Sequence, residues 1–295
     1  MMKSSVLPQS VEQVSETVTK QPLTAIDKQI STGLWLPARS LWWRELVRFY
    51  RQRSRVAGVL GSPLVFWLLL GSGLGDSFRI GGASLQSGYL EYFFPGTLTM
   101  ILLFTSIFCM MTVIEDRREG FLLSVLVSPA PRASLVLGKV LGGATLATLQ
   151  AMIFVLLAPV IGIPLGLLQL LALGGVLFLI AFALTGVGFF IAWRLDSTHG
   201  FHALINLFLL PMWILSGSVF PISGASSWIG YLMRLNPLTY GLVALRRLLY
   251  WQSLDSVASG SANLPSLAIS LVVTAGFATL TFFMALGIAS RQRQS

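Results

Sequence analysis

Long apolar stretches without a charged residue constrain this sequence more than any other feature. A helix that crosses a bilayer needs about 20 consecutive apolar residues, and several stretches reach that length. Only 11% of the residues are charged and 55% are hydrophobic, whereas soluble domains carry about 25% charged residues. The mean hydropathy of +0.78 agrees with this composition. The sequence therefore predicts an all-α integral membrane protein.

Six transmembrane helices are expected when the charge-free stretches are divided. The stretch from Lys139 to Arg194 is long enough for two helices, because Gly162 and Pro164 predict a turn within it. No ionisable residue is expected in the middle of a span. The predicted spans cover approximately residues 56–75, 92–114, 140–160, 167–193, 200–220 and 264–289.

The basic residues predict the orientation of these spans. Sixteen of the 20 Lys and Arg residues lie on the side of the N-terminal segment, among them Lys139 in the loop after the second span. Basic residues concentrate in cytoplasmic loops, so both termini of this multi-pass protein are expected in the cytoplasm, at the cell (inner) membrane. The net charge of +9 does not indicate a nucleic-acid partner, because the basic residues lie at the edges of apolar runs. The other side of the membrane carries Arg79, Arg234, Arg246 and Arg247.

The N-terminal segment divides into a polar tail and an amphipathic helix. Residues 1–36 are polar and lack the apolar core of a signal peptide, so they are interpreted as a flexible cytoplasmic tail before a transmembrane domain at 37–295. Residues 37–55 place Trp42, Phe49 and other aromatic residues on one face and arginines on another. This pattern favours a helix lying in the membrane interface, and a simple cytoplasmic anchor is the alternative.

The densest charge cluster follows the second predicted span. Five consecutive charged residues run from Glu115 to Glu119 in the stretch "MTVIEDRREGFLLSVLVSPAPR". A short charged loop that ends in prolines is suited to docking a soluble partner, and its charged side chains are expected to lie in water. An ordinary solvated turn is the alternative interpretation.

The segment 221–263, before the last span, contains two short amphipathic patterns that meet at Asn236–Pro237. A proline at that position ends one helix and begins the next. These helices are too short to span a bilayer. They are expected to dip into the outer leaflet and to pack against the bundle.

The sequence offers no recognisable catalytic or cofactor-binding motif. A Walker A loop, a G-x-S-x-G elbow and an H-E-x-x-H motif are all absent. Cys109, His199 and His202 come from separate elements and are a weak signal for a metal site. No catalytic, cofactor-binding or metal-binding residue is therefore predicted, and a source of energy would have to come from a partner.

With these features, the sequence resembles the membrane-spanning (permease) subunits of ABC-2-type transporters, including exporters of drugs, lipids or glycans. The resemblance covers residues 37–293. It depends on the amphipathic helix, the six spans, "EDRREGFLLSVLVSPAPRASLVLGKVLG" (Glu115–Gly142) and "SGSVFPISGASSWIGYLMRLNPLTYGLVALRRLLY" (Ser216–Tyr250). It implies a second copy or a homologous permease as partner, and a separate ATP-binding-cassette subunit that holds ATP and Mg²⁺ and docks on the cytoplasmic loops.

The resemblance also assigns roles to residues. The coupling element would contain Glu115, Asp116, Arg117, Arg118, Glu119, Gly120 and Leu122, with Pro129 and Pro131 closing it. The external re-entrant hairpin would be shaped by Phe220, Pro221, Asn236 and Pro237. Candidate residues of the substrate path, chosen by location on the second and fifth spans, are Thr105, Phe108, Met111, Phe208, Met212 and Trp213.

The expected function is that of a transport subunit without its own ATPase site, which exports an amphiphilic or hydrophobic substrate. A self-sufficient secondary transporter or channel is an alternative, but it would need a polar relay within the membrane. A membrane enzyme or a scaffold is a further alternative. Membrane lipid is an expected partner in every case.

Overall fold

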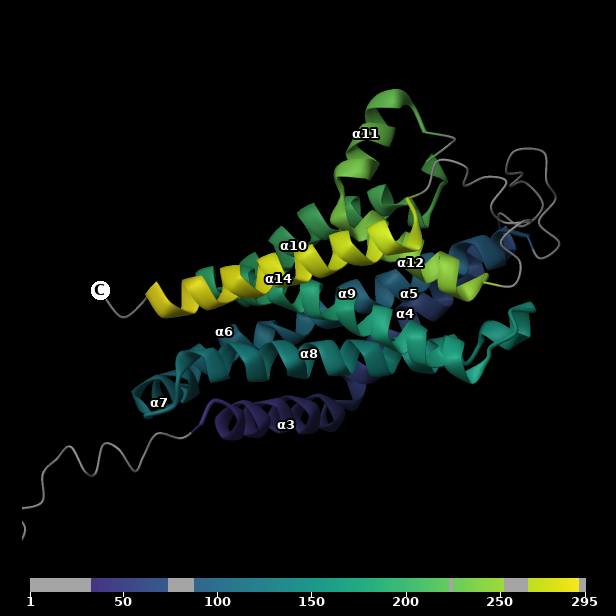
Figure 1. The fold of residues 1–295 in the computed structure, drawn as a ribbon. Helices are drawn as coiled ribbons and strands as arrows, with labels where there is room; N and C mark the ends of the chain where they lie inside the picture. Colours follow the sequence, from purple (N-terminus) through teal and green to yellow (C-terminus); the bar gives the residue numbers. More distant parts are fainter. Residues whose placement is uncertain (1–32, 74–87, 223–224, 252–264, 292–295) are drawn as a thin grey trace, which may run out of the picture.

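The structure is a computed structural model, and it describes residues 33–73, 88–222, 225–251 and 265–291. Helices form the described fold, and no strand occurs in these ranges. Figure 1 shows a bundle of long helices with α7 at one end and α11 and α12 toward the other. We call the α7 end the charged end, since it holds the residues from Glu115 to Glu119, and the opposite end the hairpin end.

The described elements follow one another along the chain as a series of helices. Their bounds are α3 Trp35–Arg51, α4 Arg53–Gly73, α5 Gly88–Cys109, α6 Met111–Arg118, α7 Phe121–Val127, α8 Arg132–Val155, the 3-10 turn Ala158–Ile161, α9 Leu167–Arg194, α10 Thr198–Trp213, the π-helical segment Ile214–Ser218, α11 Ser227–Leu235, α12 Pro237–Leu249 and α14 Leu267–Arg291.

Five helical segments within the described ranges are long and apolar enough to cross a membrane. They are Tyr89–Arg118, Arg132–Val155, Leu167–Arg194, Thr198–Ser218 and Leu267–Ser290. The predicted break between the third and fourth spans is confirmed, because a 3-10 turn and Gly162 at φ 82° separate α8 from α9. The first predicted span corresponds to α4. The apolar part of α4, Gly61–Gly73, is shorter than the five segments above.

The start of α8 differs from the prediction. Lys139 was assigned to the loop before the third span, but α8 begins at Arg132 and Lys139 lies two turns inside it with a side chain that is 1% exposed. The predicted start of the third span, after Lys139, is therefore too late, and α8 carries this buried lysine two turns from its start. The preceding bend is fixed by Pro131, whose backbone carbonyl accepts the Ser134 hydroxyl at 2.6 Å.

The amphipathic helix α3 packs closely along α8 (Figure 1). A Cβ atom on Gly138 would lie 2.7 Å from the carbonyl oxygen of Ala38, and one on Gly142 would lie 2.8 Å from Cβ of Glu45. Small residues four apart let helices in membranes approach closely. This contact holds α3 against the bundle. The helix ends at Arg51 and not at Arg55 as predicted, because Gln52 leaves helical geometry with φ −94° and ψ 77°.

The interior of the bundle is built around α5. In the Tyr89–Arg118 segment, 83% of the apolar window is buried, compared with 33% for Thr198–Ser218. Trp67 of α4 makes edge contacts with the rings of Phe94 and Phe154, at centroid distances of 5.7 and 5.4 Å. These contacts join α4, α5 and α8, while α10 keeps much of its surface open.

At the hairpin end, α10 breaks and side chains capture the backbone carbonyls that the break frees. Gly217 has φ 89°, which ends the helical geometry. Its carbonyl accepts hydrogen bonds from Tyr92 Oη at 3.1 Å and from Arg246 Nη2 at 2.8 Å. The Met212 carbonyl accepts from Asn236 Nδ2 at 2.6 Å. Carbonyls at membrane depth must find such partners, because lipid supplies none.

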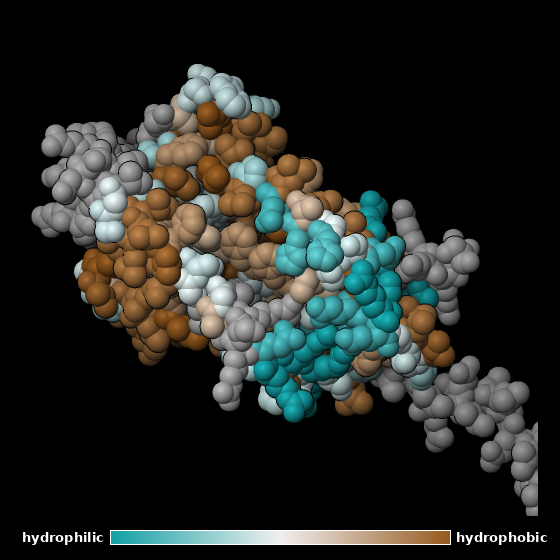
Figure 2. Space-filling view, turned by 180° about the vertical axis from the view of Figure 1, so that it is seen from behind, coloured by the Kyte–Doolittle hydropathy of each residue, from teal (hydrophilic) through white to brown (hydrophobic). Residues whose placement is uncertain are grey.

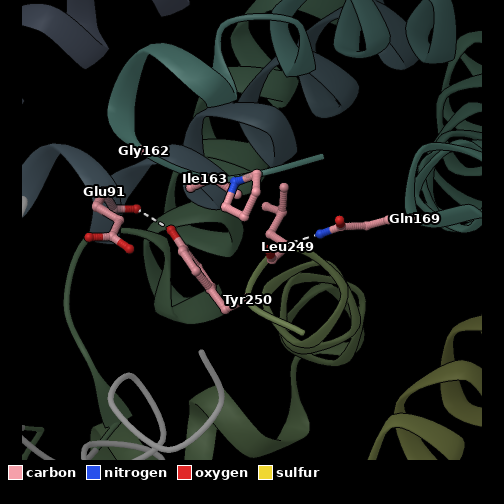
Figure 3. Close-up of a pocket in the computed structure, with 7 residues that line it drawn as sticks. Glu91, Gly162, Ile163, Gln169, Leu249 and Tyr250 are labelled. Atoms are coloured by element: carbon pink, nitrogen blue, oxygen red, sulfur yellow. Dashed lines mark hydrogen bonds between the residues drawn. The ribbon is translucent and has the colours of Figure 1, made fainter. Parts of the chain in front are cut away.

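Side-chain hydrogen bonds connect the end of α12 to α5 and α9 around a small pocket (Figure 3). Tyr250 Oη donates to the Glu91 carbonyl at 2.6 Å, and Gln169 Nε2 donates to the Leu248 and Leu249 carbonyls at 2.7 and 3.0 Å. Burial raises the pKa of Tyr250, so its hydroxyl remains a donor. The two short helices predicted around Asn236–Pro237 are confirmed as α11 and α12.

Candidate functional site at the charged end

The charged cluster belongs to the end of a long helix. Glu115, Asp116, Arg117 and Arg118 form the last turn of α6, which continues the line of α5. The prediction that the cluster lies in water is wrong for Asp116, whereas Arg118 and Glu119 are exposed. The Asp116 side chain is fully buried, whereas that of Glu119 is 61% exposed. Much of the cluster is therefore used inside the protein.

Asp116 takes part in a buried ionic network that joins three helices. Lys139 Nζ of α8 contacts Asp116 Oδ2 of α6 and Glu45 Oε1 of α3, the latter at 2.7 Å. Lys139 also donates to Thr112 Oγ1 at 3.0 Å, and that hydroxyl lies 3.0 Å from Glu45 Oε2. Buried charges are tolerated when they are paired in this way, so the network fixes the mutual positions of α3, α6 and α8.

Two arginines of α3 complete the network from its solvent side. Arg44 makes two hydrogen bonds to the Asp116 carboxylate, at 2.7 and 3.1 Å. Arg48 bridges Asp116 at 2.8 Å and Glu115 at 2.8 Å. The hydrogen bond to Asp116 raises the pKa of Arg44. Three cationic and three anionic side chains thus balance, and we call these six residues the ionic network: Arg44, Glu45, Arg48, Glu115, Asp116 and Lys139.

The remaining arginines of the cluster bind the turn that follows α9. Arg117 Nη2 donates to the Trp193 carbonyl at 2.6 Å, and Nη1 lies 2.8 Å from Asp196 Oδ1. Arg118 Nη2 donates to the Asp196 carbonyl at 2.7 Å. The end of α6 is therefore attached to α3 and α8 on one side and to the α9–α10 turn on the other (Figure 1).

Gly120 allows the chain to turn sharply from α6 into α7. It adopts φ 77°, in the left-handed region that glycine enters without strain. Phe121 then lies under the Arg44 guanidinium, 3.7 Å from the ring centroid. Leu122, which the resemblance placed in the coupling element, is 4% exposed and faces the bundle. Leu123 and Val127 are 64% and 85% exposed, so the open face of α7 is carried by these two residues.

The residues implied for the hairpin and the substrate path fall into two groups. Asn236 is 9% exposed and caps α12, with Oδ1 accepting from the Leu238 amide at 3.0 Å. Thr105 and Trp213 are buried, and they donate to Gln150 Oε1 at 2.6 Å and to the Gly96 carbonyl at 2.9 Å. The other candidates are at least partly exposed, and they are Phe108, Met111, Phe208, Met212, Phe220, Pro221 and Pro237, the last of which begins α12.

The sequence interpretation missed the acidic member of α3 and the lysine of α8. Glu45 lies four residues from both Leu41 and Phe49, and all three are buried on one face of α3. An acid on the apolar face of an otherwise basic helix is a signal of a buried cationic partner. Lys139 follows Gly138 in an apolar helix. A lysine among apolar residues is likewise a signal of a buried partner of opposite charge, so this position could have been recognised as buried.

The contacts described at the charged end are ion pairs, hydrogen bonds and a cation–π contact. Groups of three or more His, Cys, Asp and Glu side chains suited to holding a metal ion are not found in the part of the chain that the structure describes. Figure 2 shows the hydrophilic residues gathered at one end of a molecule whose remaining visible face is largely hydrophobic. The arrangement is that of a multi-pass membrane protein with a polar surface at one end.

Comparison with known proteins places this architecture in a family. The family model described as "ABC-2 type transporter" matches residues 38–250, so the chain belongs to the ABC-2 type transporter family. A protein named "Putative transport permease ycf38" from Cyanophora paradoxa is 28% identical over 232 residues, which cover 76% of this chain and 79% of that protein. The chain is therefore a transport permease by family, and such permeases in general dimerise and pair with an ATP-binding-cassette ATPase.

Proposed function

We propose that this chain is the membrane-spanning subunit of an ATP-binding-cassette exporter. It would move an amphiphilic or hydrophobic substrate, such as a drug, lipid or glycan, with ATP and Mg²⁺ held by a separate ATPase subunit. The observation that carries the proposal is the open apolar face of α7, formed by Leu123 and Val127 beyond the last charged turn of α6.

This face is suited to a soluble partner for a physical reason. Leu123 and Val127 are one helical turn apart and point to the same side, and exposed apolar side chains gain free energy when a partner covers them. Glu119, 61% exposed, adds a charge beside the face. Movement of a docked ATPase would reach the spans through α6, because the ionic network attaches α6 to α3 and α8.

The proposed topology has six spans, with α4 as the first, and both termini in the cytoplasm. The charged end would face the cytoplasm, in line with its concentration of arginines, and α11 and α12 would enter the outer leaflet. A tag at either terminus should then be cytoplasmic and a tag at Ala262, which lies outside the described residues, external. A cytoplasmic signal from the tag at Ala262 would contradict this topology.

The substrate path is proposed to follow the open side of α5, α6 and α10. Phe108, Met111, Phe208 and Met212 support this proposal, since each is at least partly exposed on these helices. They present apolar and aromatic surface to a hydrophobic substrate. Thr105 and Trp213 would act indirectly by holding α5 against its neighbours.

The proposal is tested by substitutions on α7. Leu123→Asp should reduce the ATPase that co-purifies with the permease by at least tenfold, because a charge placed in an apolar contact costs about 2 kcal/mol or more. Ser124→Asp adds the same charge at the neighbouring exposed position and is the matched control. Glu119→Lys should weaken retention less. Normal ATPase retention by Leu123→Asp would reject α7 as the docking site, and steady ATP hydrolysis by the isolated permease would reject the separate-ATPase mechanism.

A further inference from the structure

A small pocket at the hairpin end contains a carboxylate that no basic side chain balances. The described ranges hold six acidic residues, and five of them lie within 3.7 Å of a Lys or Arg nitrogen; these are Glu45, Glu115, Asp116, Glu119 and Asp196. Glu91, near the start of α5, is the sixth. It is half-buried, and no ion pair or hydrogen bond of its carboxylate is found among the described residues. A partly buried charge of this kind is stabilised by a counter-ion.

Glu91 shares the pocket with the turn between α8 and α9 and with the end of α12 (Figure 3). The lining residues are Glu91, Gly162, Ile163, Pro164, Gln169, Leu249 and Tyr250. Tyr250 Oη and Gln169 Nε2 donate to backbone carbonyls, and the Gly162 and Ile163 amides do the same at 3.1 Å each. Pro164 has no amide N–H. These donors are used and a negative charge remains, so the pocket suits a cation that brings its own N–H donors.

The size of the pocket and its polar groups favour an ammonium group over a metal ion. The volume of about 260 Å³ is below the roughly 300–1,000 Å³ of sites for drug-sized molecules, so the pocket holds a small group. Ca²⁺ takes about 6–8 oxygen ligands, and clusters of three or more acidic, His or Cys side chains are not found in the described part of the chain. An ammonium group can donate to one carboxylate and contact an aromatic ring. Figure 3 shows the Tyr250 ring between Glu91 and Leu249.

We propose that this pocket binds the primary ammonium group of an amphiphile, with the Glu91 carboxylate as its counter-ion. Beside Gln169, the start of α9 exposes Leu167, Leu168 and Leu171, which offer apolar surface to the tail of such a molecule. Two sources share this chemistry, an ethanolamine phospholipid of the bilayer and an amine-bearing substrate. The inference goes beyond the proposed function, and it depends neither on ATPase docking at α7 nor on the direction of transport.

The first test measures binding of octylammonium chloride to the full-length permease, without an ATPase, in phosphatidylcholine nanodiscs. Titration calorimetry, with empty nanodiscs subtracted, should show about fivefold weaker binding to Glu91→Gln than to the wild type, the effect of losing one partly exposed ion pair. Octyltrimethylammonium, which has the same charge but no N–H donors, should bind the wild type more weakly than octylammonium. Glu119→Gln removes an exposed carboxylate at the charged end and is the matched control with unchanged binding. Equal affinity of the wild type and Glu91→Gln for octylammonium would overturn the proposal.

The second test separates the two sources of the ammonium group. The permease is placed in nanodiscs with equal amounts of phosphatidylethanolamine and phosphatidylcholine, and the retained lipids are identified by native mass spectrometry. Enrichment of the ethanolamine lipid that is lost in Glu91→Gln would support the pocket as a lipid headgroup site. Octylammonium binding without lipid enrichment would support an amine-bearing substrate, and absence of both would reject the site. Neither measurement contains an ATPase, so failure of docking at α7 would leave both results unchanged.

Discussion

The two ends of the bundle hold their helices together by different means. At the charged end, side chains of α3, α6 and α8 pair with one another as ions, with Lys139 between Glu45 and Asp116. At the hairpin end, side chains bind backbone carbonyls that the break in α10 has freed, as Tyr92 does with Gly217. Loss of one side chain from a buried ion pair leaves an unpaired charge, whereas loss of one donor leaves a neutral carbonyl without a hydrogen bond. The charged end should therefore be the more sensitive to loss of one side chain.

The largest effect is expected from Lys139→Met. This change leaves Glu45 and Asp116 buried without the cation between them, and removing one partner of a buried ion pair costs about 3–5 kcal/mol. Thermal unfolding in detergent or bicelles measures the loss. The double variant Lys139→Met with Glu45→Gln should recover part of the stability, because Asp116 keeps Arg44 and Arg48. Wild-type stability of the single variant would show that the ionic network contributes little.

An intermediate effect is expected from Asn236→Ala at the hairpin end. The change removes the cap of α12 and the hydrogen bond to the Met212 carbonyl, and loss of a helix cap together with one hydrogen bond costs about 2 kcal/mol. Asn236→Ser keeps a capping oxygen without a charge but lacks the amide that reaches the Met212 carbonyl, so it should lose about half as much. Equal loss in the two variants would mean that the cap contributes nothing, and limited proteolysis of the hairpin provides the measurement.

The smallest effect is expected from Tyr92→Phe. The Gly217 carbonyl loses one donor but keeps Arg246 Nη2 at 2.8 Å, so a cost of about 1 kcal/mol is expected. The same variant retains the ring over which the Arg246 guanidinium lies at 4.3 Å. A fall in unfolding temperature as large as that of Lys139→Met would contradict the contrast between the two ends.

Part of the candidate site could be predicted from the sequence. The cluster from Glu115 to Glu119, the turn at Gly120 and the closing prolines all stand in one short stretch, so reading along the chain finds them. Their surroundings could not be predicted, because Arg44 and Arg48 approach Asp116 from a helix more than 60 residues away. Pairing of that kind depends on how helices pack. For the same reason, the exposed side of α7 is formed by Leu123 and Val127, whereas Leu122 faces the bundle.

Hydropathy along the chain determined the class of protein and the approximate places of its long helices. Apolar side chains in water and backbone groups without hydrogen bonds cost free energy within each segment separately. The sequence of a segment is therefore enough to predict whether it forms a long apolar helix. Gly162 and Asn236–Pro237 interrupt helices for equally local reasons. These features required no knowledge of neighbouring helices.

The tertiary structure decided which polar groups are buried and which are open. It placed Lys139 inside α8 against two acids, and it broke α10 at Gly217, where donors from α5 and α12 converge. Each outcome depends on side chains brought together from distant segments. The free energy of a charge or a carboxamide in a membrane is set by its neighbours in space, and residue order alone does not contain that information.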